Sequence, residues 1–166
     1  GHEYVIKAID KIKKDFPKVL YLIAGKGPYL KNIQELVKEL KLENNVKFLG
    51  WVTEPEKSVL LEKSDIFIMT PVVVKESVEG FGMAFLDASF HKVAVIGSRS
   101  GGVMDAIKDN YTGLLCEPEN IDDITKKIYI LANSSEIRNQ LGRQGHELVV
   151  KSYIWEKKSL EYLSFL

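Results

Sequence analysis

The chain has 166 residues and a mass of 18.8 kDa, which is the size of one domain. Hydrophobic residues make up 45% of it and charged residues 28%, a composition typical of a folded globular domain and not of a disordered chain. Its 23 basic and 23 acidic residues give a formal net charge of +0, which argues against a protein that binds nucleic acid through phosphates. No apolar run approaches the roughly 20 residues of a membrane span.

Cys116 is the one cysteine of the sequence, so an intrachain disulfide is excluded. A single thiol outside any Cys/His cluster fits a reducing cytoplasm and argues against structural zinc. The sequence opens with Gly1 and a charged, helical pattern instead of a signal peptide. We therefore expect either a processed front or a piece of a longer polypeptide.

Apolar residues at helical spacing predict a first helix that ends before Pro17. The run Val19–Ala24 predicts a strand buried on both faces, because it is continuously apolar and short. The further expected elements are a helix to about Leu40, a strand at 46–49, a helix at 54–63, a strand at 66–69, a helix at 82–91, a strand at 93–96, a short helix from Gly101, a strand at 113–116, helices at about 121–132 and 135–151, and a terminal helix from about Trp155.

Short strands that alternate with helices predict an α/β fold with an open, doubly wound parallel sheet. Residues 1–166 would form one domain. Ligands of such sheets bind at the carboxyl ends of the strands. The loops to inspect are therefore 25–28, 50–53, 70–82, 97–102 and 117–120.

The loop at 70–82 ends in Glu79-Gly-Phe-Gly82 at a strand-to-helix junction. Backbone N–H groups at a helix N-terminus form an anion site, and Glu79 just before them could accept sugar hydroxyls. The alternative is that Glu79 is an acid at a helix start and the glycines only make a turn. Spacing alone leaves both interpretations open.

The loop at 97–102 also follows a strand and opens a helix, with Gly101 and Gly102 at its end. It predicts a second cradle for phosphate or sugar hydroxyls, and the alternative is a flexible turn. Both loops would open on one crevice. The Gly25-Lys-Gly-Pro28 turn lacks the third glycine of a dinucleotide fingerprint, and Lys26 is expected to be solvated.

The pattern of the remaining reactive side chains argues against a metal site, a hydrolase site and a reactive cysteine. The three histidines have no partners at metal-ligand spacing, and His91 is expected to end a helix. Ser98 and Ser100 lack a hydrolase elbow, and Cys116 is expected to behave as a small buried hydrophobe. Trp155, Tyr162, Leu163 and Leu166 form one helical stripe, expected as core or as a partly exposed docking face.

Several motifs, in order, resemble the family 4 glycosyltransferases, which are retaining, nucleotide-sugar-dependent "group 1" enzymes of the GT-B fold. The motifs are Glu79-Gly-Phe-Gly82 with Asp87 eight positions after Glu79, Val93-Ala-Val-Ile-Gly97, Gly101-Gly-Val-Met-Asp105 and Gly113-Leu-Leu-Cys-Glu-Pro118, with support from Ile23-Ala-Gly-Lys-Gly-Pro28, Val46-Lys-Phe-Leu-Gly50, Gly142-Arg-Gln-Gly145 and Tyr153-Ile-Trp-Glu156. The resemblance covers nearly the whole chain.

The resemblance implies the C-terminal, donor-binding half of a two-domain enzyme. Glu79 would be the catalytic-site residue that binds donor-sugar hydroxyls, and the backbone of Gly80, Phe81 and Gly82 would approach the sugar and diphosphate. Asp87 would grip the ribose. The backbone of Trp51 and Val52 would lie beside the base.

The sequence departs from the family in three places. Asp87 is one methylene shorter than the usual Glu, and His91-Lys92 replaces a turn of small residues. The family's first strand, with an Arg and a Lys that hold the pyrophosphate, would precede Gly1, as would the acceptor-binding N-terminal domain. The sheet would then contain a gap, unless Val19–Ala24 pairs directly with Ile66–Met69.

The expected function is transfer of a sugar from a nucleotide-sugar donor to an acceptor with retention of configuration, in glycan biosynthesis. The alternatives are another GT-B-like nucleotide-sugar enzyme, such as an epimerase, and a non-catalytic α/β binding module. No cofactor or metal is expected. The expected partners are a nucleoside diphosphate sugar, the N-terminal domain and a glycan or lipid-linked acceptor, but no nucleic acid. The expected location is the cytoplasm, where the missing domain could hold the enzyme at the inner face of the membrane.

Overall fold

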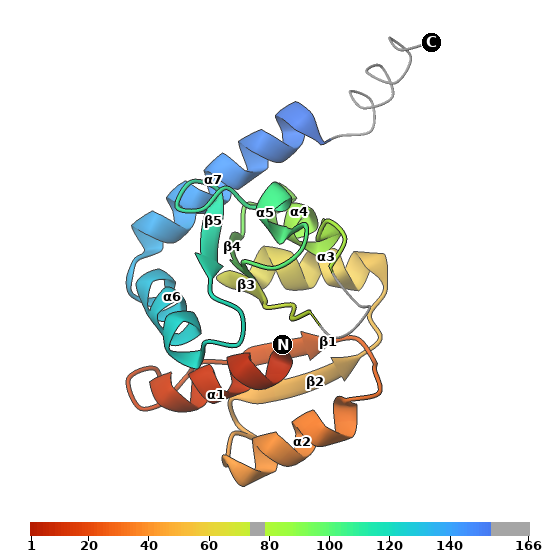
Figure 1. Cartoon of the computed structure of the whole chain (residues 1–166), viewed down its shortest axis with the longest axis vertical. Coiled ribbons are helices and arrows are strands. Elements are labelled where there is room, and N and C mark those ends of the chain that lie inside the picture. The colour runs from red at the N-terminus through yellow and green to blue at the C-terminus, as the bar shows by residue number, and fades with distance from the viewer. Residues whose placement is uncertain (74–78, 154–166) are drawn as a thin grey trace.

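The structure is a computed structural model of the chain, and it describes residues 1–73 and 79–153. Strands and helices alternate along it, as the sequence predicts (Figure 1). In chain order the elements are α1 (His2–Ile12), β1 (Tyr21–Ala24), α2 (Leu30–Glu39), β2 (Val46–Gly50), α3 (Glu54–Lys63), β3 (Ile66–Met69), α4 (Met83–Phe90), β4 (Ala94–Ser98), α5 (Val103–Ala106), β5 (Gly113–Cys116), α6 (Ile121–Asn133) and α7 (Ser135–Ser152). The expected terminal helix, with Trp155, Tyr162, Leu163 and Leu166, lies outside the described residues.

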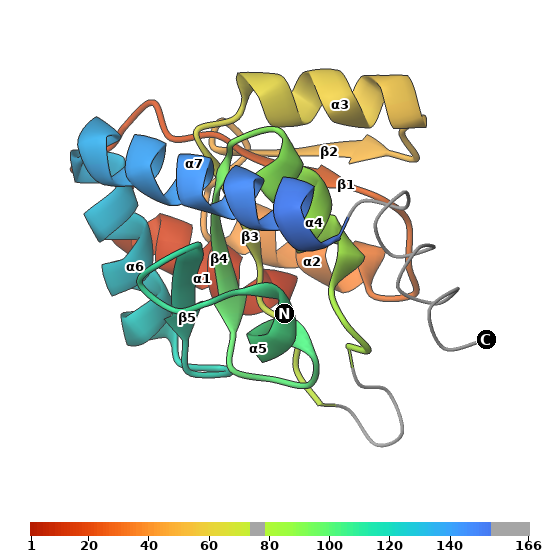
Figure 2. The same ribbon diagram turned by 90° about the horizontal axis from the view of Figure 1, so that it is seen from above.

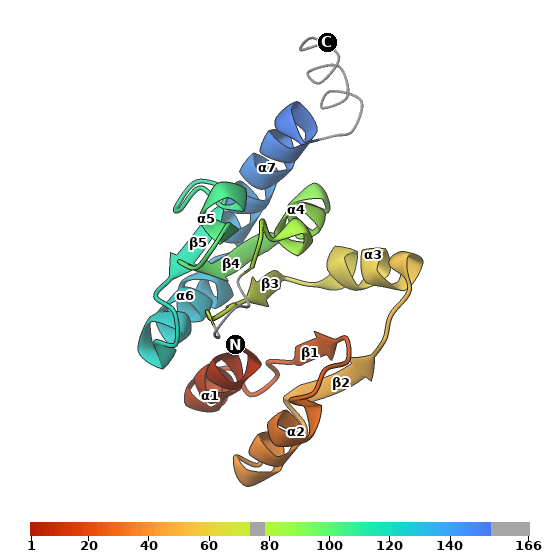
Figure 3. The same cartoon turned by 45° about the vertical axis from the view of Figure 1, so that its right-hand side comes forward.

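Every pair among the described strands is parallel, which confirms the predicted α/β class. The strands form two separate sheets, one with the order β1-β2 and one with the order β3-β4-β5. Among the described strands, β1 and β3 do not pair with each other, and Figure 3 shows the two sheets standing apart. Of the two arrangements expected from sequence, the structure therefore has the gap.

Local sequence explains where the helices start. Thr53 accepts the N–H of Glu56, whose carboxylate accepts the N–H of Thr53, and this capping box opens α3. Asn120 and Ser134 cap α6 and α7 through their side-chain oxygens.

The helices cover both faces of the sheets, with α3, α4 and α7 on one side and α1, α2 and α6 on the other (Figure 2). The core on the α1 side contains residues from both sheets, including Tyr21, Ile23 and Ile96. The core on the α4 side includes Phe85 and Val95, but it contains no described residue of β1 or β2. The two cores together hold β4 in place, and it is buried along its whole length.

Two strands, β1 and β3, are only partly buried. Tyr21 and Ile23 are buried, but Leu22 and Ala24 on the other face of β1 are exposed, and the strand starts only at Tyr21. The expectation of a strand buried on both faces is therefore wrong, because the α4-side core does not extend over β1. All four residues of β3 are half-buried, since its edge toward β1 has no neighbouring strand.

Within residues 1–73 and 79–153, no helix is both long and apolar enough to cross a membrane.

Candidate functional site at the carboxyl edge of the strands

The site centres on the turn that opens α4. Gly82 is the residue before the helix, and its backbone is left-handed, with φ of +81°. A Cβ at this position would lie 2.6 Å from the ring of Phe85, a side chain that is fully buried in the α4-side core. The turn therefore requires glycine for its backbone conformation and for its packing.

Glu79 is held at this turn by its own side chain. Its Oε1 accepts a hydrogen bond of 3.0 Å from the backbone N–H of Gly82. The carboxylate thus lies at the N-terminal end of α4, where an anion is favoured by the helix dipole. This contact agrees with both sequence interpretations, since a residue that caps the helix start is also a fixed acceptor beside the following N–H groups.

The two glycine-rich loops meet, as their place after neighbouring strands predicts. The N–H of Gly102 donates to the carbonyl oxygen of Glu79 over 3.0 Å. A Cβ on Gly102 would lie 1.9 Å from the carbonyl oxygen of Gly80, so this contact also requires glycine. The neighbouring Ser100 hydroxyl is buried and has no hydrogen-bond partner within the described part of the chain.

Polar side chains fix the loops around this turn. The Ser98 hydroxyl donates to the carbonyl oxygen of Pro71 over 2.5 Å, and the Thr70 hydroxyl donates to that of Gly1 over 3.1 Å. Arg99 pairs with Asp109 and, through Nε at 3.2 Å, with Glu117. Arg99 therefore ties the loop after β4 to the end of β5.

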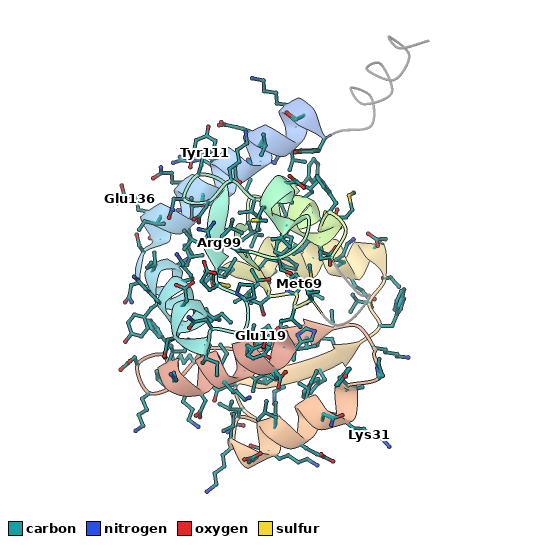
Figure 4. All side chains as sticks on the ribbon, viewed as in Figure 1. Lys31, Met69, Arg99, Tyr111, Glu119 and Glu136 are labelled. Carbon is teal, nitrogen blue, oxygen red and sulfur yellow. The ribbon has the colours of Figure 1, made fainter. Side chains whose placement is uncertain are left out.

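Strand ends that are far apart in sequence gather on one face of the molecule. Met69 ends β3, Arg99 follows β4 and Glu119 follows β5, and Figure 4 shows the three labelled residues near its centre. Lys31 and Glu136, on α2 and α7, lie at the periphery of the same view. The carboxyl ends of β3, β4 and β5 thus provide one shared edge.

Asp87 lies on α4 and is engaged by a residue that the sequence reasoning missed. Lys57 Nζ lies 2.8 Å from Asp87 Oδ2 and 2.7 Å from Glu54 Oε2, so it bridges α3 and α4. The hydrogen bond to Asp87, followed by that to Glu54, raises the pKa of Lys57. The sequence shows two acids, Glu54 and Glu56, in the first turn of α3. These acids suggest an ionic partner near Lys57, but they do not indicate that this lysine also contacts Asp87.

The predicted base-side residues follow β2. Trp51 is 77% exposed and Val52 is half-buried, next to Gly50 with its φ of +70°. The structure gives no hydrogen bond or ring contact from Trp51 to the Glu79–Gly82 turn within the described residues. Phe81 in that turn instead approaches Tyr153, with ring centroids 5.6 Å apart.

Three further side chains, Lys26, His91 and Cys116, lie as the sequence predicts. Lys26 is exposed, and His91 follows the last residue of α4. Cys116 is fully buried, and burial raises the pKa of its thiol to about 12, so it is unreactive at neutral pH. No cluster of three or more His, Cys, Asp or Glu in the described ranges could hold a metal ion.

The fold defines the class of protein as a doubly wound α/β domain whose parallel strands end at one shared edge. Comparison with known proteins gives the family. The sequence model described as "Glycosyl transferases group 1" matches residues 1–148, so the chain belongs to the group 1 glycosyltransferases.

Relatives of known name agree with this membership. The chain is 27% identical to a GDP-mannose-dependent alpha-(1-6)-phosphatidylinositol monomannoside mannosyltransferase of Mycobacterium tuberculosis, over 100% of this chain and 44% of that protein. It is 30% identical to the N-acetyl-alpha-D-glucosaminyl L-malate synthase of Bacillus anthracis, over 95% of this chain and 39% of that protein. The chain thus spans less than half the length of these relatives.

Solved structures show the same fold. HepE of Anabaena, solved with UDP and glucose, superposes with a TM-score of 0.87 at 21% identity, over 100% of this chain and 45% of that one. The C-terminal domain of the group 1 protein LpcC from Francisella tularensis gives a TM-score of 0.80 at 26% identity, over 93% of this chain and 80% of that one. The predicted GT-B-type architecture is therefore confirmed.

Proposed function

We propose that this chain is the donor-binding half of a two-domain glycosyltransferase that transfers a sugar from a nucleoside diphosphate sugar with retention of configuration. The observation that carries the proposal is a pair of joined turns, Glu79–Gly82 before α4 and Ser100–Gly102 before α5. Support comes from family membership and from the similar HepE, whose structure contains UDP and glucose.

In this proposal the backbone of Gly80, Phe81 and Gly82 faces the sugar and the diphosphate. Gly80 has no side chain, and no described atom lies within 4 Å of where its Cβ would be, so a ligand can come close to the backbone just before α4. The positive end of the α4 dipole stabilises the negative charge that grows on the departing diphosphate. Glu79 accepts hydrogen bonds from sugar hydroxyls and holds the sugar in the reactive orientation.

Asp87 is proposed to bind the ribose. Lys57 donates to Oδ2 of Asp87, and no hydrogen bond or ion pair to Oδ1 is found within the described residues, so that oxygen can accept a ribose hydroxyl. Lys57 fixes the orientation of the shorter Asp side chain. The exposed ring of Trp51 and the backbone of Val52 are proposed to lie beside the base.

Calorimetric titration with UDP-glucose and GDP-mannose tests this function. Glu79→Gln should weaken the binding of whichever donor is preferred. Glu136→Gln is the matched control, because Glu136 is also an acid in the first turn of a helix but lies on α7 at the periphery. Equal loss in both variants, or no binding of either donor at millimolar concentration, would contradict the proposal.

A further inference from the structure

The turn from Glu79 to Gly82 has few side chains that could fix its backbone. Two of its four residues are glycines, and no described atom lies within 4 Å of where a Cβ on Gly80 would be. Gly82 has a left-handed backbone, with φ of +81°. Phe81 is therefore the one apolar side chain through which this turn can pack against the rest of the domain.

The ring of Phe81 contacts Tyr153, the residue that follows α7. The two ring centroids lie 5.6 Å apart with an interplanar angle of 54°, which is within the range of a favourable aromatic contact. Both side chains are half-buried and pack against the α4-side core. The backbone N–H of Tyr153 donates to the carbonyl oxygen of Val149 over 2.8 Å, so the residue is fixed to the end of α7.

The hydroxyl of Tyr153 points to a second element beside the turn. It donates to the carbonyl oxygen of Asp105 in α5 over 3.5 Å, which is long for a hydrogen bond between oxygens. The loop that leads into α5 contributes Gly102, whose N–H donates to the carbonyl oxygen of Glu79. Tyr153 thus links the end of α7 to both glycine turns, and its ring makes the closer contact.

We infer that Tyr153 is a positioning residue for the Glu79–Gly82 turn, because its ring holds Phe81 and Phe81 holds the backbone of the turn. The inference rests on the proposed function of this turn as the donor site. Tyr153 acts on the side chain of Phe81, whereas the backbone of the turn faces the ligand. A turn that is already ordered loses less conformational entropy when a ligand binds, so the aromatic contact raises the donor affinity.

Three variants isolate the ring contact. Tyr153→Leu removes the ring but keeps an apolar side chain, and Tyr153→Phe keeps the ring but removes the hydroxyl. Tyr129→Leu is the matched control. Tyr129 also contacts a phenylalanine ring, that of Phe16 with centroids 5.1 Å apart, and also donates its hydroxyl to another group, Asp15, but it lies on α6.

The first measurement uses the ligand-free 166-residue chain. Amide hydrogen exchange of Gly82 and Gly102, followed by NMR, reports on the turn, because both N–H groups donate to Glu79. Tyr153→Leu should speed their exchange by about three- to tenfold, the size of one aromatic contact, and Tyr153→Phe and Tyr129→Leu should leave it unchanged. Unchanged exchange in Tyr153→Leu, or an equal rise in either of the other two variants, would overturn the inference.

The second measurement is the donor affinity from calorimetric titration with UDP-glucose and GDP-mannose. Tyr153→Leu should weaken binding by about three- to tenfold, and Tyr153→Phe should retain it. Phe81→Leu removes the same contact from the other side, so the test does not depend on the folding of one variant. The double variant should bind no more weakly than Phe81→Leu alone, because both changes act through one contact.

Additive losses in the double variant would overturn the inference, since Tyr153 would then act by a route other than Phe81. The same titrations distinguish this failure from a failure of the proposed function. If the unchanged chain bound neither donor, the proposed function would be wrong, and the exchange rates without ligand would still decide whether Tyr153 positions the turn.

Discussion

At the scale of single residues, Glu79 shows why a helix-start acid and a binding residue are hard to separate. Its Oε1 accepts the N–H of Gly82, which contributes to the start of α4, and the same bond fixes the carboxylate beside the turn. A substitution that keeps an acceptor oxygen separates the two roles. Gln retains the amide oxygen, whereas Ala loses it.

We therefore predict that Glu79→Gln in the complete enzyme lowers kcat/KM by roughly 10²–10³, as expected for one preorganised electrostatic contact. The free energy of unfolding should change by less than about 1 kcal/mol. Glu79→Ala should in addition lose about 0.5–2 kcal/mol of stability, because the Gly82 N–H loses its acceptor. Steady-state kinetics and urea unfolding measure the two effects. If Glu79→Gln instead left kcat/KM unchanged and unfolded the domain, Glu79 would serve only as a helix cap.

The ion pair between Lys57 and Asp87 leads to a second prediction. Asp87→Asn should weaken nucleoside diphosphate binding by about tenfold or more, because a hydrogen bond to a charged group contributes roughly 1.5–3 kcal/mol. Asp65→Asn is the control, since Asp65 also pairs with a basic residue, Arg138, but precedes β3 at the opposite end of the strand. If calorimetry gives the same affinity for Asp87→Asn and the unchanged protein, Asp87 does not reach the ribose.

His2 gives the chain a predicted pH dependence. Its ring nitrogen lies 2.8 Å from the Tyr21 hydroxyl, and burial lowers the His2 pKa below its ordinary 6.5. The unfolded chain then binds the proton more readily, so the stabilisation is present above pH 6.5 and is lost as the pH falls through the folded pKa. Urea unfolding at pH 7.5 and pH 5.5 should show a smaller decrease for His2→Gln than for the unchanged chain. Identical decreases would show that His2 titrates alike in both states.

At the scale of elements, the order and type of helices and strands could be predicted from apolar periodicity and from glycine and proline positions. The burial of β1 could not, because the apolar run at 19–24 does not reveal that one face lacks a covering core. The meeting of the two glycine loops followed from parallel strands that end at one edge. The link from Asp87 to Lys57 could not be predicted, because it depends on how α3 and α4 lie side by side.

The packing of α7 gives a prediction at this scale. A Cβ on Gly142 would lie 2.0 Å from the carbonyl oxygen of Lys92, in the turn between α4 and β4. Ala is the better helix former by up to about 1 kcal/mol, but overpacking against backbone costs roughly 1–3 kcal/mol. Gly142→Ala should therefore lower the free energy of unfolding, measured in urea. Gly27→Ala is the control, with nothing within 4 Å of the added Cβ, and an equal effect of the two substitutions would contradict this packing account.

At the scale of the whole molecule, the chain spans less than half the length of its named relatives, and its sheet has an open position. Both observations agree with the proposal that it works as one half of a larger enzyme. The resemblance places the Arg and Lys that hold the pyrophosphate, together with the acceptor-binding domain, in the other part.

We accordingly predict that the 166-residue chain alone converts no nucleotide sugar into glycoside. Its donor affinity should be lower than that of the complete enzyme by on the order of a hundredfold, because the resemblance assigns two charge-assisted contacts of roughly 1.5–3 kcal/mol each to residues outside these 166. Mass spectrometry of the products tests for glycoside formation, and calorimetry measures the donor affinity. Sustained glycosyl transfer by the isolated chain would contradict the proposal that it works only as one half of a larger enzyme.

The central claim, that the carboxyl edge beside α4 binds the donor nucleotide, is tested most directly by an NMR titration of the 166-residue chain with UDP and with GDP at millimolar concentration. The account predicts that one of them shifts backbone amide signals of Gly80, Gly82 and Gly102 together with those of Trp51 and Asp87, and leaves α6 unchanged. Shifts confined to α6 or α2, or no shifts with either nucleotide, would contradict it.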